Sequence, residues 1–212
     1  NAWGFDLSAA CAGFVYAMIV GAQFIQAGTH KKVLVIGGDK MSAAVDYTDR
    51  NTCILFGDGA GGVLLEPTED ENRLIDFIFH VDGSGGEHLC QPGGGSLHPA
   101  THETVDKKMH FIKQNGRAVM KFASSNMADV SGLIIERNGL TSDDIKLLIP
   151  HQANRRIIAA AARRMKLPLD KVLINIDKFG NTTDATVPIA LWEAVETGRI
   201  ERGDYIVMAT AG

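Results

Sequence analysis

The chain has only three cysteines, Cys11, Cys53 and Cys90, and no apolar run long enough to cross a membrane. Three is an odd number without the spacing of a disulfide framework, so we expect reduced thiols and a cytoplasmic location. A bilayer-spanning helix needs about 20 consecutive apolar residues. We therefore expect no membrane association.

The sequence also lacks an excess of charge of either sign. Its 21 Lys and Arg residues against 25 Asp and Glu residues give a net charge of −4. This balance provides no electrostatic reason to expect nucleic acid as a partner. With 212 residues, of which 45% are hydrophobic, the chain is long enough for one large domain or two small ones with a buried core.

Short apolar segments alternate with amphipathic ones, a pattern typical of an α/β fold. We expect strands at residues 2–7, 32–37, 53–56, 62–66, 74–81, 146–150, 171–175 and 205–209, and helices at about 12–26, 115–138, 153–166 and 187–197. Residues 82–108 are rich in glycine and proline and predict a long loop. The glycine-rich run 57–62 lacks the lysine of a phosphate-binding loop and predicts a tight turn between strands.

Cys11 lies where the first expected strand gives way to the first expected helix. Unpaired backbone N–H groups and the positive end of the helix dipole favour a thiolate at such a position, and the thiolate is the nucleophilic form. A cysteine among apolar residues is otherwise an inert core residue. The segment therefore predicts either a nucleophile or a buried structural thiol.

Two further polar residues follow expected strands. His151 comes directly after an apolar strand and before a helix, and Asn181 lies in a glycine-containing turn after the next strand. In α/β sheets, residues at the carboxyl ends of strands line the active crevice. We expect Cys11, His151 and Asn181 to face one cavity, although a core histidine and an ordinary turn asparagine are the alternatives.

Five segments together resemble β-ketoacyl-acyl carrier protein synthase III, the initiating condensing enzyme of type II fatty acid synthesis. They are "FDLSAACAGFVYA", "ILFGDGAGGVLLE", "DGSGGEHLCQPGGGS", "IPHQANRRI" and "KFGNTT". The resemblance implies a thiolase-like, layered α-β-α-β-α fold and a homodimer paired near residues 53–56. It also implies truncation at the N-terminus and just before the C-terminus. Residues 1–70 would be the latter part of the N-terminal half, and 71–212 the C-terminal half without its last residues.

The resemblance implies a catalytic set of Cys11, His151 and Asn181. Cys11 would take the acyl group from an acyl-coenzyme A, and malonyl-acyl carrier protein would then lose carbon dioxide. His151 and Asn181 would donate hydrogen bonds to the thioester oxygen on which charge develops. Coenzyme A and acyl carrier protein thioesters are then substrates, and no cofactor is implied. We expect the 212 residues alone to be inactive.

Further site residues are implied by the same resemblance. Arg50 would lie against the coenzyme A adenine and Asn154 near the pantetheine arm, and Arg155 and Arg156 would receive the acidic carrier protein. The alternative for these arginines is an ordinary solvated surface charge. Asp184 departs from the usual family run after Asn-Thr, Ser-Ala-Ala-Ser, and adds a carboxylate near the site.

Two other readings of the chain stay open. It is either the initiating condensing enzyme, a sister Cys-His-Asn condensing enzyme of secondary metabolism, or a non-catalytic acyl-binding or dimerisation module. A metal site is a weaker idea, because the spacing of its four candidate ligands fits no common zinc pattern. These ligands are His88, Cys90, His98 and His102.

Overall fold

A computed structural model describes residues 2–71 and 73–212. The helices are α1 (Gly13–Gln26), α2 (His102–Asp106), α3 (Gly116–Arg137), α4 (Arg155–Arg164), α5 (Ile176–Phe179) and α6 (Thr186–Glu196). The strands are β1 (Val33–Lys40), β2 (Asp58–Leu65), β3 (Leu89–Cys90), β4 (Lys113–Gln114), β5 (Ile145–Pro150) and β6 (Tyr205–Ala209). Short 3-10 helices are η1 (Ala10–Ala12), η2 (Met41–Ala43), η3 (Gly83–His88), η4 (Leu169–Lys171) and η5 (Thr183–Ala185).

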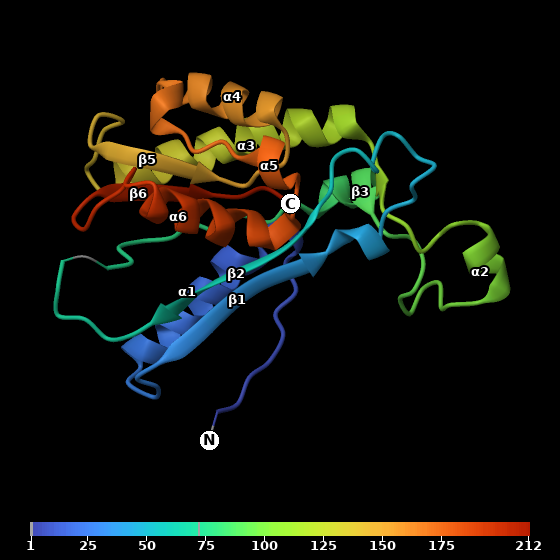
Figure 1. The fold of residues 1–212 in the computed structure, drawn as a ribbon, viewed down its shortest axis with the longest axis horizontal. Helices are drawn as coiled ribbons and strands as arrows, with labels where there is room; N and C mark the ends of the chain where they lie inside the picture. Colours follow the sequence, from blue (N-terminus) through green and yellow to red (C-terminus); the bar gives the residue numbers. More distant parts are fainter. Residues whose placement is uncertain (1, 72) are drawn as a thin grey trace.

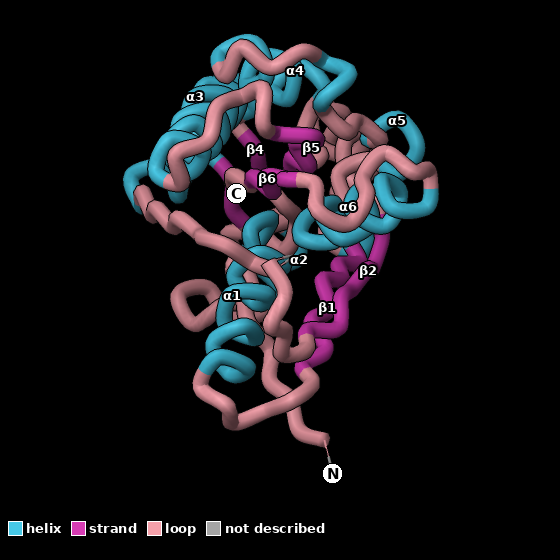
Figure 2. Tube along the Cα trace, turned by 90° about the vertical axis from the view of Figure 1, so that its left-hand side faces the viewer, coloured by secondary structure: helices cyan, strands magenta, loops and turns pink. Residues whose placement is uncertain are grey.

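The elements form layers (Figure 1). Helices α3 and α4 pack together over the parallel pair β5–β6, and α6 contacts β5 from the other side. Helix α6 also contacts β2, while α1 packs on β1, so both helices lie between β5–β6 and the antiparallel ribbon β1–β2. Figure 2 shows the same order from the side. Helices therefore cover both faces of β5–β6.

The core forms where the β5–β6 pair meets its covering helices. Leu148 and Ile149 of β5 are fully buried, as strands covered on both faces require. Ile158 and Ala161 of α4 pack against one side of this pair at helical spacing. Burying one such aliphatic side chain contributes about 1.5–3 kcal/mol. This rigid centre carries the loop that follows β5.

The expected long helices are confirmed. The side chain of Asn115 caps α3 by accepting the N–H of Ala118, and Gly139 follows the helix with φ +70°. Asn154 caps α4 in the same way by accepting the N–H of Arg156 at 2.8 Å. The strands expected at 32–37, 62–66, 146–150 and 205–209 are confirmed as β1, β2, β5 and β6.

Four expected strands are not formed. Residues 2–7 run as an extended segment with Trp3 and Phe5 exposed, and residues 74–81 are likewise irregular in their described part. Residues 53–56 form a turn that makes one isolated bridge, Phe56 to Asn181, and 171–175 contribute one bridge, Val172 to Leu148. Apolar composition alone does not make a strand, because its backbone groups need a paired neighbour.

The tight turn predicted at residues 57–62 is wrong, because most of this run belongs to β2. Its glycines are explained by the close approach of neighbouring elements. A Cβ on Gly59 would lie 2.9 Å from Ile189, and a Cβ on Gly61 would lie 3.0 Å from Pro188, both on α6. The loop expected at 82–108 is largely irregular but contains η3, β3 and α2.

Across residues 2–71 and 73–212, no helix combines the length and apolar character that crossing a membrane requires. Within the same residues, no group of three or more His, Cys, Asp or Glu side chains is arranged to hold a metal ion.

Candidate active site

Cys11 lies in η1, the turn that leads into α1, and only 6% of it is exposed. The turn packs against η5. It also abuts the end of the chain, because a Cβ on Gly212 would lie 2.5 Å from the Cβ of Cys11. The small residues next to Cys11, such as Ala10 and Ala12, thus allow other backbone segments to pack closely around the buried thiol.

The thiolate expected from the helix dipole is not what this environment favours. Burial raises the pKa of the Cys11 thiol to about 12, and the nearby carboxylates of Asp39 and Asp184 act in the same direction. A hydrogen bond to the backbone N–H of Cys11 lowers the pKa but does not compensate. At neutral pH, the unliganded protein therefore holds Cys11 as a thiol.

His151 follows β5 and is 1% exposed. Its backbone N–H donates to the carbonyl of Ala209 at 2.7 Å, which ties it to the end of β6. Burial lowers the pKa of the imidazole to about 4, although a hydrogen bond with the Thr183 backbone acts in the opposite direction. The ring is therefore neutral at pH 7.

The tautomer of this ring depends on where the hydroxyl of Thr186 donates its hydrogen. Thr186 Oγ1 lies 2.7 Å from His151 Nδ1 and 2.8 Å from the Thr183 carbonyl oxygen, and it has one hydrogen to donate. When Thr186 donates to Nδ1, His151 carries its proton on Nε2 and can donate there. When Thr186 donates to the carbonyl, Nδ1–H donates to the hydroxyl and Nε2 is an acceptor.

Asn181 is fixed by its backbone and its side chain. Its N–H donates to the Leu55 carbonyl at 2.8 Å, and its own carbonyl accepts the N–H of Gly57 at 3.0 Å. The side-chain Oδ1 accepts the N–H of Thr183 at 2.9 Å. With Oδ1 engaged, the Nδ2 amide is the group left to donate to a ligand, and unlike imidazole it does not titrate near neutral pH.

Residues 181–186 link the three predicted residues. Asn181 holds the N–H of Thr183, the hydroxyl of Thr186 holds the ring of His151, and η5 packs against the turn of Cys11. Segments of the chain that are 30 residues apart or more are thus brought to one place. Two of these groups are uncharged hydrogen-bonding side chains, and the third is a thiol.

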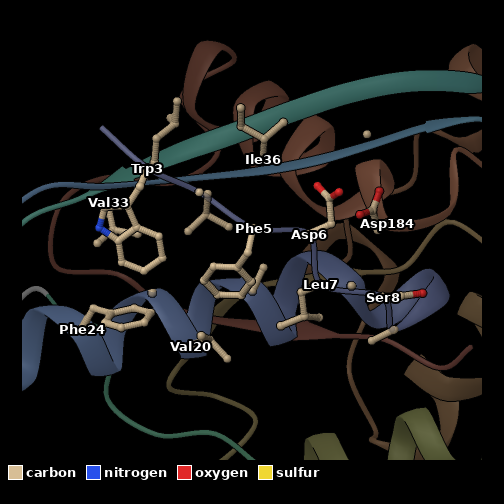
Figure 3. Close-up of a pocket in the computed structure, with 18 of the residues that line it drawn as sticks. Trp3, Phe5, Asp6, Leu7, Ser8, Val20, Phe24, Val33, Ile36 and Asp184 are labelled. Carbon is tan, nitrogen blue, oxygen red and sulfur yellow. The ribbon is translucent and has the colours of Figure 1, made fainter. Parts of the chain in front are cut away.

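A cavity beside this cluster is a groove and not the predicted hollow. It is open to solvent, has a volume of about 910 Å³ and includes none of the three residues. Figure 3 shows Trp3 and Phe5 of the extended segment lying between α1 and β1, with Asp6 and Asp184 at one end. The groove reaches Ala10 and Gly13, the neighbours of Cys11.

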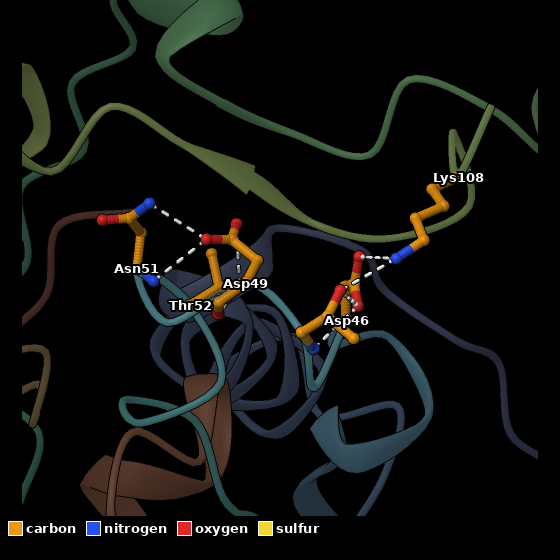
Figure 4. A network of polar contacts seen from close by, with 6 residues as sticks. Asp46, Asp49, Asn51, Thr52 and Lys108 are labelled. Carbon is orange, nitrogen blue, oxygen red and sulfur yellow. Dashed lines mark hydrogen bonds and ion pairs between the residues drawn. The ribbon is translucent and has the colours of Figure 1, made fainter.

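Arg50 is exposed on the loop between η2 and β2. Asp46 organises the loop by accepting the N–H and hydroxyl of Thr48 at 2.9 and 2.6 Å. Lys108 reaches from the distant 82–114 region to Asp46, with Nζ 2.9 Å from Oδ2 (Figure 4). These contacts lower the pKa of the Asp46 carboxyl. The guanidinium of Arg50 therefore extends from an anchored loop.

The predicted residues on α4 separate into two kinds. Asn154 is the half-buried N-cap of the helix, so it has a structural role whatever else it contacts. Arg155 and Arg156 are exposed at the first turn and form no ion pair within residues 2–71 and 73–212. Arg164 at the other end is paired with Asp129 at 2.7 Å. Arg155 and Arg156 therefore provide free positive charge at the end of α4 that follows the His151 loop.

Sequence reasoning missed three polar residues that build the site. Gln152 is buried and joins the Pro150 and Leu173 carbonyls to the N–H of Asn175. Thr186 contacts His151, and Asp39 of β1 accepts the hydroxyl of Thr183. Of these three, only Gln152 could have been found from the sequence, because it lies inside the segment "IPHQANRRI" that carries the resemblance.

Comparison with known proteins identifies the group to which the chain is similar. The family profile 3-oxoacyl-[acyl-carrier-protein (ACP)] synthase III matches residues 5–83, and the profile of its C-terminal part matches residues 135–212. A β-ketoacyl-[acyl-carrier-protein] synthase III from Koribacter versatilis is 52% identical over the whole chain. One with the same name from Chlorobium luteolum is 56% identical.

A solved structure supports the same conclusion about the fold. The 3-oxoacyl-[acyl-carrier-protein] synthase III of Aquifex aeolicus superposes with a TM-score of 0.87 and 42% identity, over 98% of this chain and 63% of that one. The thiolase-like α/β fold predicted from the sequence is confirmed. The chain spans 64–65% of the length of the two curated relatives.

The comparisons also bear on the alternative functions that the sequence left open. The names of these relatives do not favour a sister enzyme of secondary metabolism or a non-catalytic module. They do not bear out the expectation that the 212 residues alone are inactive.

Proposed function

Because the chain belongs to the 3-oxoacyl-[acyl-carrier-protein] synthase III family, we propose that the protein containing it starts fatty acid chains. The proposed reaction condenses a short acyl-coenzyme A with malonyl-acyl carrier protein, releases carbon dioxide and gives a 3-oxoacyl-acyl carrier protein. The single observation that supports this most is the linkage of Cys11, His151 and Asn181 through residues 181–186.

In the first half-reaction, Cys11 is the proposed nucleophile. Its sulfur attacks the thioester carbonyl carbon, a carbon–sulfur bond forms, and the bond to coenzyme A breaks. The thiol proton leaves with the coenzyme A thiolate. Because the pKa of Cys11 is raised, this half-reaction starts from the thiol, and its rate is expected to rise with pH.

In the second half-reaction, His151 and Asn181 are the proposed donors to the thioester oxygen of the malonyl group. Loss of carbon dioxide places negative charge on that oxygen, and the resulting carbanion attacks the acyl carbonyl carbon on Cys11. A carbon–carbon bond forms, the carbon–sulfur bond to Cys11 breaks, and the Cys11 thiolate takes up a proton. A neutral imidazole suits this role, because its Nε2–H can donate without a proton transfer. The role requires the tautomer in which Thr186 donates to His151 Nδ1.

Several accompanying assignments are proposals of the same kind. Arg50 and Asn154 would bind the nucleotide and pantetheine parts of coenzyme A, and Arg155 and Arg156 the acidic carrier protein. We further propose that no metal or other cofactor takes part, that the protein is a cytoplasmic homodimer, and that its two halves meet near residue 70.

Intact-mass measurement tests the first half-reaction in the protein that contains this chain. Incubation with acetyl-coenzyme A is expected to add one acetyl group to the native protein and none to Cys11→Ala. An acetyl group that persists in Cys11→Ala, or no adduct on the native protein with any acyl-coenzyme A, would contradict the proposal.

Decarboxylation tests the second half-reaction without acyl transfer. Cys11→Ala is expected to release carbon dioxide from malonyl-acyl carrier protein, and adding His151→Ala or Asn181→Ala should lower that rate about 10²- to 10³-fold. Unchanged release in both double variants would remove these residues from the mechanism.

A further inference from the structure

Two carboxyl groups from distant parts of the chain meet below the turn of Cys11. Asp39 of β1 accepts hydrogen bonds on Oδ2 from the hydroxyl of Thr183 and, at 3.3 Å, from the N–H of Asp184. Asp184 Oδ1 is buried and has no hydrogen-bond partner among the described residues. Two glycines make room for Asp184, because a Cβ on Gly13 would lie 3.1 Å from its Oδ2 and one on Gly37 would lie 3.3 Å from its Cγ.

Two carboxylates this close, partly shielded from water, do not both ionise easily. Burial, a hydrogen bond to the Asp39 side chain and the charge of Asp39 raise the pKa of Asp184 to about 7. A protonated Asp184 donates to Asp39, whereas two ionised groups repel. A protonated Asp184 beside the Asp39 carboxylate is therefore favoured near neutral pH.

We propose that Asp39 and Asp184 form a carboxyl pair beside Cys11 that keeps a proton on Asp184 near neutral pH and, once this proton is lost, suppresses ionisation of the Cys11 thiol with two negative charges. The segments that carry the pair, β1 and η5, pack against each other, and η5 packs against η1. This inference rests on the proposed function only for the role of Cys11 as nucleophile. The pair acts through Cys11, so Asp39 and Asp184 are positioning residues.

The titratable groups around the pair come from several neighbouring segments. Besides Cys11 on η1, they are Asp6 in the extended segment, Lys40 on β1 and Asp58 on β2. The neutral ring of His151 is connected to the pair through Thr183. Asp58 is held by the N–H and hydroxyl of Ser42 at 2.7 and 2.6 Å, and Lys40 faces Asp58. The negative charge closest to Cys11 is therefore that of the pair.

Alkylation of Cys11 measures the ionisation of the thiol directly. The native protein, Asp184→Asn and Asp39→Asn would be treated with iodoacetamide across pH 6–11, and modification of the Cys11 peptide followed by mass spectrometry. At pH 8 and above, where Asp184 is ionised, each variant lacks one of the two negative charges next to the thiol, so the apparent pKa of Cys11 is expected to fall by about one unit. Alkylation at pH 8 should then be about tenfold faster. Asp177→Asn, the same change on exposed α5, is the matched control and should leave the profile unchanged.

Two further measurements keep the proposal falsifiable. The infrared band of a protonated carboxyl is expected at pH 6 in the native protein and absent in Asp184→Asn. The double variant Asp39→Asn/Asp184→Asn should lower the pKa of Cys11 further than either single change, because both negative charges are then absent. Unchanged alkylation profiles in folded Asp184→Asn and Asp39→Asn, or a native protein without the band, would overturn it. Acetyl transfer is scored separately, so a failure of the proposed function is not mistaken for a failure of this inference.

Discussion

His151 Nδ1 lies 2.7 Å from the hydroxyl of Thr186, and both side chains are buried. This contact joins the loop after β5 to the first residue of α6. Replacing Thr186 with valine keeps the shape of the side chain but removes the hydroxyl that positions the ring. We expect Thr186→Val to lower decarboxylation of malonyl-acyl carrier protein about tenfold, less than the loss of a direct donor, and to leave acetylation of Cys11 nearly unchanged.

Thr197→Val is the matched control for this prediction. Thr197 lies just beyond the other end of α6, where its hydroxyl donates to the Glu193 carbonyl at 2.6 Å in an exposed position. It should not alter decarboxylation. Equal effects of the two substitutions, or a similar loss in acetylation and decarboxylation, would show that Thr186 does not act through His151.

The Asp46–Lys108 ion pair provides a test of the proposed contact between Arg50 and the nucleotide end of coenzyme A. Because this pair anchors the loop of Arg50, Lys108→Met should loosen the loop without touching Cys11. We expect the KM for acetyl-coenzyme A to rise about three- to tenfold, with kcat nearly unchanged. An acetyl donor that lacks the nucleotide, such as acetyl-N-acetylcysteamine, should show no change.

Lys107→Met controls for the loss of a neighbouring positive charge. Lys107 pairs with Glu103 on the exposed surface of α2 at 2.5 Å, and such pairs contribute little to stability. Its KM for acetyl-coenzyme A should match that of the native protein. A parallel rise in KM for both acetyl donors in Lys108→Met would refute the idea that Lys108 acts through Arg50.

Helix positions followed from the sequence, because their signals are local. The cap at Asn115 and the positive φ of Gly139 mark the ends of α3 within one or two residues of the prediction. Strands depend on partners, so the apolar segments 2–7 and 53–56 were wrongly assigned. Where no neighbouring strand pairs with a segment, its composition says little about its conformation.

The same distinction applies to the site. Cys11, His151 and Asn181 lie in short recognisable segments, and their roles stay predictions. The contact between Asp39 and Thr183 joins residues 144 positions apart, and nothing in the local sequence of β1 predicts it. The expected thiolate was wrong for a related reason, because a dipole argument at one helix end ignores the burial and carboxylates that the fold brings to Cys11.

Arg156 provides a test of carrier-protein docking. It is exposed at the first turn of α4, near His151, and an acidic partner would be attracted to this charge. Arg156→Gln should raise the KM for malonyl-acyl carrier protein about three- to tenfold at low salt, and the difference should shrink at high salt. Lys146→Gln, at the opposite end of β5, should have no such effect. An equal rise in KM for acetyl-coenzyme A would argue against docking.

Asp184 makes the stability of the protein depend on pH. The pKa of its carboxyl is 3.8 without its neighbours and about 7 in the fold, so the folded state binds more protons than the unfolded state between these values. Stability contributed by this group therefore falls as pH rises from 4 to 7 and stays low above. Asp184→Asn should remove this loss and stabilise the protein at pH 8 by up to about 2 kcal/mol, after allowance for solvent screening of a half-buried group.

Urea denaturation at pH 4.5, 6 and 8 measures this difference. The stability gained by Asp184→Asn over the native protein should grow with pH, while Asp177→Asn should show no such trend. His151 also titrates in this range, with a pKa lowered to about 4, but it is present in all three proteins and cancels in the comparison. A gain that is the same at every pH would mean that the carboxyl of Asp184 titrates alike in the folded and unfolded states, because only a difference in proton binding makes the gain depend on pH.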